Sequence, residues 1–236
     1  MSDLPRLMST SAEAQTFGGL TYQIDGDLVP VLTVDVSHRA VYFAHHLLLW
    51  KHPSVRIAVR PSHGLFKRMA AGVHDCVTVA SGAGQIAFSH DGAGRIVPIH
   101  LPRGKELHVR EHQFLAATDA VDYTCERVRG IRSSMYGEES VFIEKFHSER
   151  GDGVLWLHGC GNVFEKALGS GEAIDIEPSG WLYKDATVRI ETRADRLEHS
   201  GLAGAYIVVN RFTGPGRVGI QSMSRQGEAQ ERDPFG

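Results

Sequence analysis

The sequence predicts an all-β fold built from three pseudo-equivalent repeats, and three observations lead to this prediction. Residues 149–188 repeat the pattern of an earlier segment at a shift of about 67 residues, which aligns Gly94 with Gly161 and Gly104 with Gly171. Segments rich in β-branched and aromatic residues precede these bodies. Glycine-containing turns divide those segments, and the combination is typical of short paired strands.

A third, degraded copy of the body lies near the N-terminus. The segment 28–36 predicts a strand in which Leu32, Val34 and Val36 share one face,. The apolar segment 42–50 suits a buried strand or a short helix, and its alignment with the later copies favours a strand,.

The turn of this first copy differs from the turns of the other two. It has Arg39 where the later copies have Gly104 and Gly171. Glycine adopts positive φ at little cost, and arginine does not. We therefore expect positive φ at the two glycines and a different turn at Arg39.

Three segments are predicted to be β-hairpins, at residues 72–88, 137–157 and 204–221,. The first two stand in front of a body, whereas the third has no body after it and the first body has no hairpin before it. The simplest expectation is that the C-terminal hairpin pairs with the N-terminal body. Such closure would cover edge strands that otherwise invite aggregation.

Length and composition indicate one soluble domain. The chain has 236 residues, 22% charged and 42% hydrophobic, with a net charge of −3. We expect a single domain over residues 1–236, with an ordered core at about 17–224 and a polar tail at 225–236. A near-neutral chain without a Lys/Arg cluster argues against nucleic-acid binding.

The same data lead us to expect a cytoplasmic protein without a transmembrane segment. The apolar runs, such as residues 47–50, are far shorter than the roughly 20 residues of a membrane-spanning helix,. The three cysteines include no C-x-x-C pair, as is typical of reduced thiols in a cytosol,.

The repeated segments resemble a known family. The three predicted hairpins, the L-x-x-G-x-x-I/L-x-V/I bodies and the segment FTGPGRVGIQ at 212–221 are similar to the family called altered inheritance of mitochondria protein 24, over about residues 17–224. The resemblance implies a TRAP-like fold, named after the tryptophan RNA-binding attenuation protein. Three repeats of a short double-stranded β-helix or β-sandwich then form a pseudo-threefold barrel or prism. The resemblance implies no established reaction, and kinship to an RNA-binding fold does not confer RNA binding.

Residue types that could carry chemistry are present without a recognisable motif. Of the thirteen histidines, His108 and His112 would share a strand face but lie about 13 Å apart, too far for one metal ion,. No Ser lies in a G-x-S-x-G turn,. The glycines at 82–84 and 214–216 precede strands, unlike a phosphate-binding loop. We therefore expect no catalytic, cofactor-binding or metal-binding residues and no cofactor; a metal site assembled from different repeats stays open.

The second and third copies differ in charge at equivalent positions. One stripe is basic and the other acidic: His108, Arg110 and His112 against Asp175, Glu177 and Ser179. The stripes are either two solvated strand faces or faces that meet across the subunits of a closed ring.

These observations lead to three functional hypotheses. The first is a non-enzymatic scaffold or interaction protein that self-associates through β surfaces into a homo-oligomer, with a trimer favoured and protein partners unknown. The second is a small-ligand-binding protein with a pocket between repeats. The third is a metal-dependent or hydrolytic enzyme.

Overall fold

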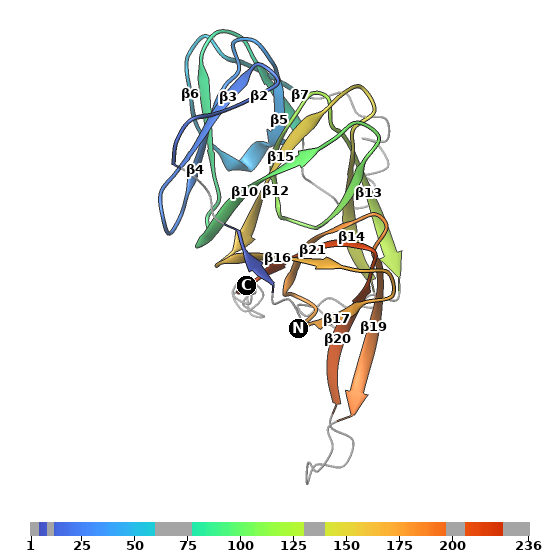
Figure 1. Cartoon of the computed structure of the whole chain (residues 1–236). Helices are drawn as coiled ribbons and strands as arrows, with labels where there is room; N and C mark the ends of the chain where they lie inside the picture. The colour runs from blue at the N-terminus through green and yellow to red at the C-terminus, as the bar shows by residue number, and fades with distance from the viewer. Residues whose placement is uncertain (1–4, 9–11, 60–76, 130–139, 197–205, 224–236) are drawn as a thin grey trace, which may run out of the picture.

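The chain folds as an all-β protein with four antiparallel sheets. Our computed structural model describes residues 5–8, 12–59, 77–129, 140–196 and 206–223 (Figure 1). In these residues the helical structure is one 3-10 turn, η1 (His45–Leu47), so none of their helices could cross a membrane. The predicted all-β class is confirmed.

The described residues contain strands over most of their length. In order they are β1 (Arg6–Leu7), β2 (Gln15–Phe17), β3 (Leu20–Asp25), β4 (Val31–Asp35), β5 (Val41–Ala44), β6 (Leu48–Lys51), β7 (Arg56–Val59), β8 (Val77–Ser81), β9 (Gln85–Ser89), β10 (Gly94–Leu101), β11 (Glu106–Arg110), β12 (Phe114–Thr118), β13 (Asp122–Arg129), β14 (Ser140–His147), β15 (Gly153–Cys160), β16 (Val163–Leu168), β17 (Ala173–Ile176), β18 (Trp181–Asp185), β19 (Arg189–Arg196), β20 (Tyr206–Thr213) and β21 (Gly216–Gln221).

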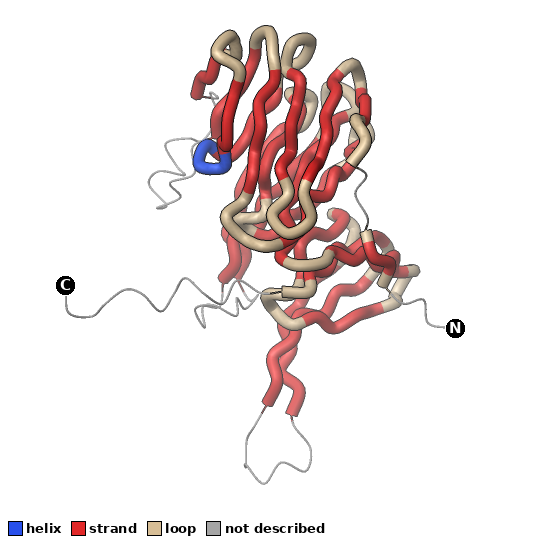
Figure 2. The backbone as a smooth tube through the Cα atoms, turned by 90° about the vertical axis from the view of Figure 1, so that its left-hand side faces the viewer, coloured by secondary structure: helices blue, strands red, loops and turns tan. Residues whose placement is uncertain are grey.

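The sheet orders show which strands are neighbours. The seven-stranded sheet has the order β1-β16-β21-β18-β11-β14-β13, and the six-stranded sheet has the order β10-β15-β12-β5-β8-β7. The five-stranded sheet is β2-β3-β4-β9-β6, and the three-stranded sheet is β17-β20-β19. The β19–β20 ribbon extends away from the rest of the described chain (Figures 1 and 2).

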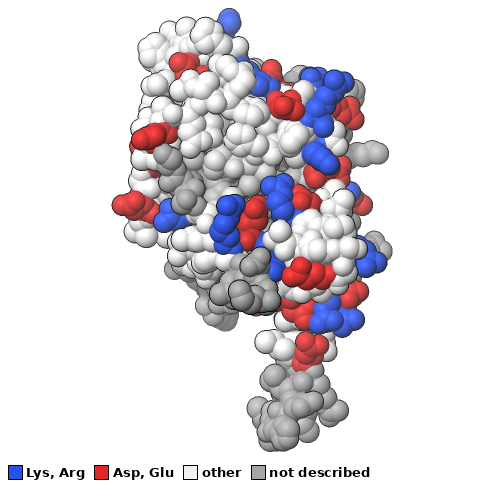
Figure 3. Space-filling view, viewed as in Figure 1, with Lys and Arg blue, Asp and Glu red and all other residues white. Residues whose placement is uncertain are grey.

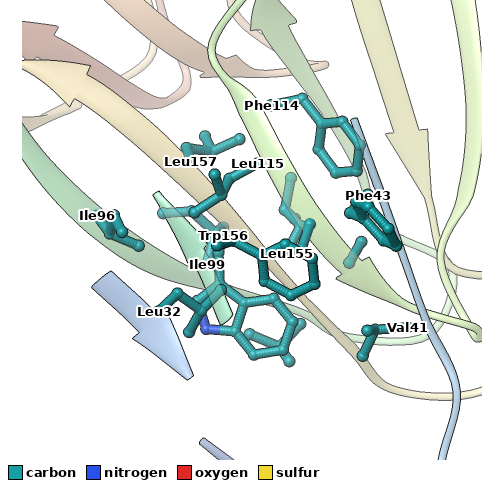
Figure 4. Close-up of a cluster of buried hydrophobic side chains, with 14 of the residues drawn as sticks. Leu32, Val41, Phe43, Ile96, Ile99, Phe114, Leu115, Leu155, Trp156 and Leu157 are labelled. Carbon is teal, nitrogen blue, oxygen red and sulfur yellow. The ribbon is translucent and has the colours of Figure 1, made fainter. Parts of the chain in front are cut away.

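The main core lies around β12 and β15, whose residues are all buried. Trp156 is fully buried and contacts the ring of Tyr22 edge-on, with 5.1 Å between the ring centroids. Figure 4 shows Trp156 among aliphatic and aromatic side chains that come from several strands. A second core cluster surrounds Trp181 and Phe212.

The first copy of the body has the predicted alternation of buried residues, but its second predicted strand is divided in two. Leu32, Val34 and Val36 are buried, as predicted. The segment predicted as one strand over 42–50 is instead β5 and β6, separated by η1. At η1 the chain turns from the six-stranded sheet to the five-stranded sheet, so one continuous strand could not serve both.

The predicted turn difference between the copies is confirmed. Gly104 has φ 78° and Gly171 has φ 76°. Among the described non-glycine residues only His112 has positive φ, so the Arg39 turn differs. The Arg39 side chain instead donates a hydrogen bond of 2.7 Å to Asp119.

Substituting either turn glycine by valine is expected to lower the free energy of unfolding by about 1 kcal/mol or more. A Cβ at Gly104 or Gly171 would meet open space, so the cost is backbone strain alone. Arg39→Val is the control and should be milder. Thermal melts of the three variants measure this difference, and equal losses at all three positions would contradict it.

The three predicted hairpins are wrong as hairpins, although their strands exist. The two strands of each segment belong to different sheets: β8 and β9, β14 and β15, and β20 and β21. Gly84, at φ 135°, lies so close to the turn between β6 and β7 that an added Cβ would be 2.8 Å from His52 Cβ. At this turn, between β8 and β9, the chain passes from the six-stranded sheet to the five-stranded sheet. The residues before β8, β14 and β20 in these segments lie outside the described ranges.

The predicted closure between the C-terminal segment and the first body is also wrong. Strand β21 pairs with β16 and β18, and β20 pairs with β17 and β19. The first body strands β4 and β6 pair with β9. Each pair of strands thus joins the body just before it, and pairing over this smaller sequence separation costs less entropy than a connection across the whole chain.

Strands also lie before residue 17, where the ordered core was predicted to begin. Strand β1 pairs with β16, through Arg6 opposite Glu165 and Leu7 opposite Phe164. Strand β2 pairs with β3. Residues 6–7 and 15–17 are ordered because neighbouring strands supply their hydrogen-bond partners,.

Candidate functional site

Strand β6 ends the five-stranded sheet and exposes two large apolar side chains. Leu49 is 54% exposed and Trp50 is 44% exposed. In the described structure β6 pairs with β9 alone, so its outer backbone groups lie along an open edge. An apolar edge strand is a template for the addition of another strand.

Strand β17 is an open edge of the three-stranded sheet. It pairs with β20 alone in the described residues. Ala173 and Asp175 are exposed, and Ile174 is half-buried. Arg211 donates two hydrogen bonds to the Asp175 carboxylate, at 2.6 and 2.5 Å, and these bonds lower the pKa of Asp175.

Two internal joints show how such edges meet within the chain. Strand β5 pairs with β12, with Tyr42 opposite Ala117. Strand β11 pairs with β18, with Leu107 opposite Asp185. Both joints are antiparallel, and each fuses strands from successive bodies into one larger sheet.

A cavity lies beside the second joint. Its volume is about 530 Å³, and it is bounded by the turn from His100 to Glu106 and by residues 185–187. Arg217 also lines it and is held by Asp185 at 2.9 and 3.1 Å. The cavity therefore presents both cationic and anionic side chains.

A polar cluster is buried near this cavity. Lys184 is 4% exposed, and its ammonium donates a hydrogen bond of 2.7 Å to the Val188 carbonyl. The same ammonium lies 3.0 Å from His108 Nδ1, and Glu106 lies 2.6 Å from His108 Nε2. Burial is the main cause that lowers the pKa of Lys184 to about 8. Burial and the Lys184 charge also lower the pKa of His108.

The basic stripe predicted on an outward face is largely inside the molecule. Arg110 is 5% exposed and donates a hydrogen bond of 3.0 Å to the Ser179 carbonyl of the same chain. His108 belongs to the buried cluster, while His112 is exposed. The expectation of a solvated stripe is therefore wrong for Arg110, whose guanidinium is held by the Ser179 carbonyl, and His108 is half-buried beside Lys184.

The acidic stripe is tied to neighbouring groups. Asp175 binds Arg211, and Glu177 accepts a hydrogen bond of 2.8 Å from the Ser179 amide. Ser179 is buried.

His90, which follows β9, meets His158 of β15. The rings of His90 and His158 are buried and stacked, with 4.1 Å between centroids and 5° between planes. The described residues contain no group of three or more His, Cys, Asp or Glu side chains that could hold a metal ion.

Charge is distributed unevenly over the surface. Figure 3 shows few charged side chains on the upper left of this face, where Figure 1 places β3, β4 and β6. Charged side chains gather on the right and in the lower half of this face. The β6 edge therefore lies in a region of the molecule with little charge on this face.

These features define an all-β protein of four antiparallel sheets, with two open edges of a kind that the chain pairs elsewhere. The chain belongs to the Mitochondrial biogenesis AIM24 family, whose model matches residues 22–223. This confirms the resemblance found in the sequence.

A solved structure with a similar fold is that of protein SPYM3_0169 from Streptococcus pyogenes. The TM-score is 0.66 at 21% sequence identity, and the match covers 87% of this chain and 94% of that chain. No curated protein matches this chain.

Sequence reasoning did not find the open edges, the cavity or the buried Lys184. The sequence predicts that Leu49 and Trp50 lie in the core, because apolar residues in a predicted strand are usually buried. Nothing in the sequence indicates that Lys184 is buried, because a lysine in a strand ordinarily faces water.

Proposed function

We propose that the described chain comprises three TRAP-like units: β4–β9, β10–β15 and β16–β21. What supports this is one pairing scheme that recurs in all three. In each unit the fifth strand pairs with the second and fourth, and the sixth pairs with the first and third. Strands β1 and β3 add to β16 and β4, the first strands of two units, and β2 adds to β3.

On this architecture the protein acts as a non-enzymatic scaffold that self-associates through β edges into a homo-oligomer, with a trimer favoured. The observation that carries this function is the open edge β6, which exposes Leu49 and Trp50 where the equivalent strands β12 and β18 are covered. An exposed apolar edge of this kind is costly for a monomer, and a partner strand removes the cost.

The cavity supports a second candidate function, which is binding of a small ligand between the second and third units. Its volume of about 530 Å³ lies within the usual range for ligand sites,. Native mass spectrometry of the purified protein tests this candidate. A retained small molecule that is lost in Arg217→Ala supports ligand binding, and a bare chain in both proteins contradicts it.

Self-association is expected to weaken when the β6 edge becomes charged. Leu49→Lys combined with Trp50→Lys should shift the oligomer towards monomer, because desolvating two ammonium groups opposes strand addition. Analytical ultracentrifugation over a range of protein concentrations measures the shift.

Leu28→Lys is the matched control, since Leu28 is 71% exposed and lies outside the sheet edges. It should leave the mass distribution unchanged. A wild-type protein that stays monomeric at every concentration would contradict the scaffold function.

A further inference from the structure

We propose that strand β17 of one copy pairs antiparallel with strand β6 of a second copy. This inference rests on the proposed self-association and specifies its interface. Each of these open edges is thus covered by another copy of this chain. Every copy contributes its β6 edge to one contact and its β17 edge to another.

The sheet orders carry the argument. The seven-stranded sheet joins β16-β21-β18 to β11-β14-β13, and the six-stranded sheet joins β10-β15-β12 to β5-β8-β7. Each joins the first, sixth and third strands of one unit to the second, fifth and fourth strands of the unit before it. Two half-sheets are left over: β4-β9-β6, within the five-stranded sheet, and β17-β20-β19.

The leftover halves have the composition of a third joined sheet. Joining β6 to β17 would give the order β4-β9-β6-β17-β20-β19, which repeats the arrangement of the other two. The new contact is therefore of a type that the chain already forms twice within itself.

Residues on the two open edges are more exposed than residues on the joined strands, as this interface requires. Strands β5 and β12, which form one joint, are buried throughout. By contrast, Leu49 and Trp50 on β6 and Ala173 and Asp175 on β17 are exposed. Pairing the two edges would cover apolar surface and satisfy the outer backbone groups of both strands.

The two edges do not meet within one copy. Figure 1 shows β6 near one end of the molecule and β17 near the other. Because the two edges differ, the contact is heterologous. It closes into a ring or continues as a filament, depending on the rotation between copies.

The internal joints also give the register. Residues of different units correspond when they pair with equivalent residues of the fifth or sixth strand. In the second strands, Ile174 corresponds in this way to Tyr42 and Leu107. In the third strands, Lys51 corresponds to Ala117. The β5–β12 joint then places Ala173 opposite His52, and the β11–β18 joint places it opposite Pro53.

Cysteine cross-linking between differently labelled full-length chains tests the interface. One chain carries Ala173→Cys, and the other carries either His52→Cys or Pro53→Cys. Directly opposed residues lie about 4.5–5.5 Å apart between Cα atoms, within reach of a disulfide. Under mild oxidation we expect an intermolecular disulfide for one of the two pairings, identified as linked peptides by mass spectrometry. Thr124→Cys on the exposed edge strand β13 replaces Ala173→Cys in the control and should give no such link.

The outcomes separate this interface from self-association in general. An oligomer without the link from 173 to 52 or 53, or one linked mainly from 52 to 52, would overturn the β6–β17 pairing while leaving the scaffold function intact. A chain that ultracentrifugation finds monomeric would overturn both. An oligomer that gives the link supports both.

Discussion

Trp156→Ala is expected to lower the free energy of unfolding by about 3–5 kcal/mol, the cost of removing a large buried aromatic side chain and leaving a cavity. Trp156 is fully buried on β15, between β10 and β12 in the six-stranded sheet. Its ring packs edge-on against Tyr22, which belongs to the five-stranded sheet. The substitution therefore removes a contact between two sheets as well as apolar burial.

Trp50→Ala is the matched control, because Trp50 is 44% exposed. It should cost less than about 1 kcal/mol. Urea unfolding at low protein concentration is the appropriate measurement, because association raises apparent stability by mass action. Trp156→Phe keeps a ring in the site and should lie between the two, which preserves the test if the alanine variant does not fold. Equal losses for Trp50→Ala and Trp156→Ala would contradict the position of Trp156 in the core.

The free energy of unfolding is expected to rise between about pH 8 and pH 10 because of Lys184. Burial lowers the Lys184 pKa to about 8 in the folded chain, against about 10.4 for an unfolded lysine,. Between these values the unfolded chain binds more protons, so stability increases with pH. The full difference corresponds to about 3 kcal/mol, which is an upper limit.

Lys184→Met should flatten this rise, because it removes the titrating amine. Lys105→Met, which removes an exposed lysine, is the control and should keep the rise. Urea unfolding at intervals from pH 7 to 10 measures both slopes. Burial raises the pKa of Tyr183, so stability should fall again above about pH 10, where unfolded tyrosines lose their protons,. A Lys184→Met slope equal to that of the wild type would contradict the assignment.

The residues that the sequence places correctly are those governed by local rules. Leu32 and Val34 alternate with polar residues, and a strand with one buried face requires that period,. Gly104 and Gly171 adopt positive φ because glycine alone does so at little cost,. Neither inference depends on which strands are neighbours in space.

The partners of the strands could not be predicted in the same way. Two β-branched runs separated by a glycine turn describe a hairpin and a turn between layers equally well. Strands β8 and β9 form the latter, since β8 pairs with β5 and β7 while β9 pairs with β4 and β6. For the same reason the C-terminal strands were predicted to pair with the first body, whereas they pair with the third.

The candidate site was the least predictable part of the protein. The alternating polar residues of β11 suggested a solvated stripe, yet Arg110 is buried with its guanidinium on the Ser179 carbonyl. Leu49 and Trp50 suggested core, yet both are exposed. Burial of a strand face depends on whether another strand or layer covers it, and that is a non-local property.

Local residue patterns were enough to establish the all-β class, the positions of most strands, the glycine turns and the family. The sheet orders, the burial of Lys184 and Arg110, and the unpaired outer edges of β6 and β17 emerged only from the folded chain. The physical reason is that side-chain alternation and turn conformation are set by a few neighbouring residues. Strand pairing is set by which edges, distant in the chain, can satisfy each other's backbone hydrogen bonds.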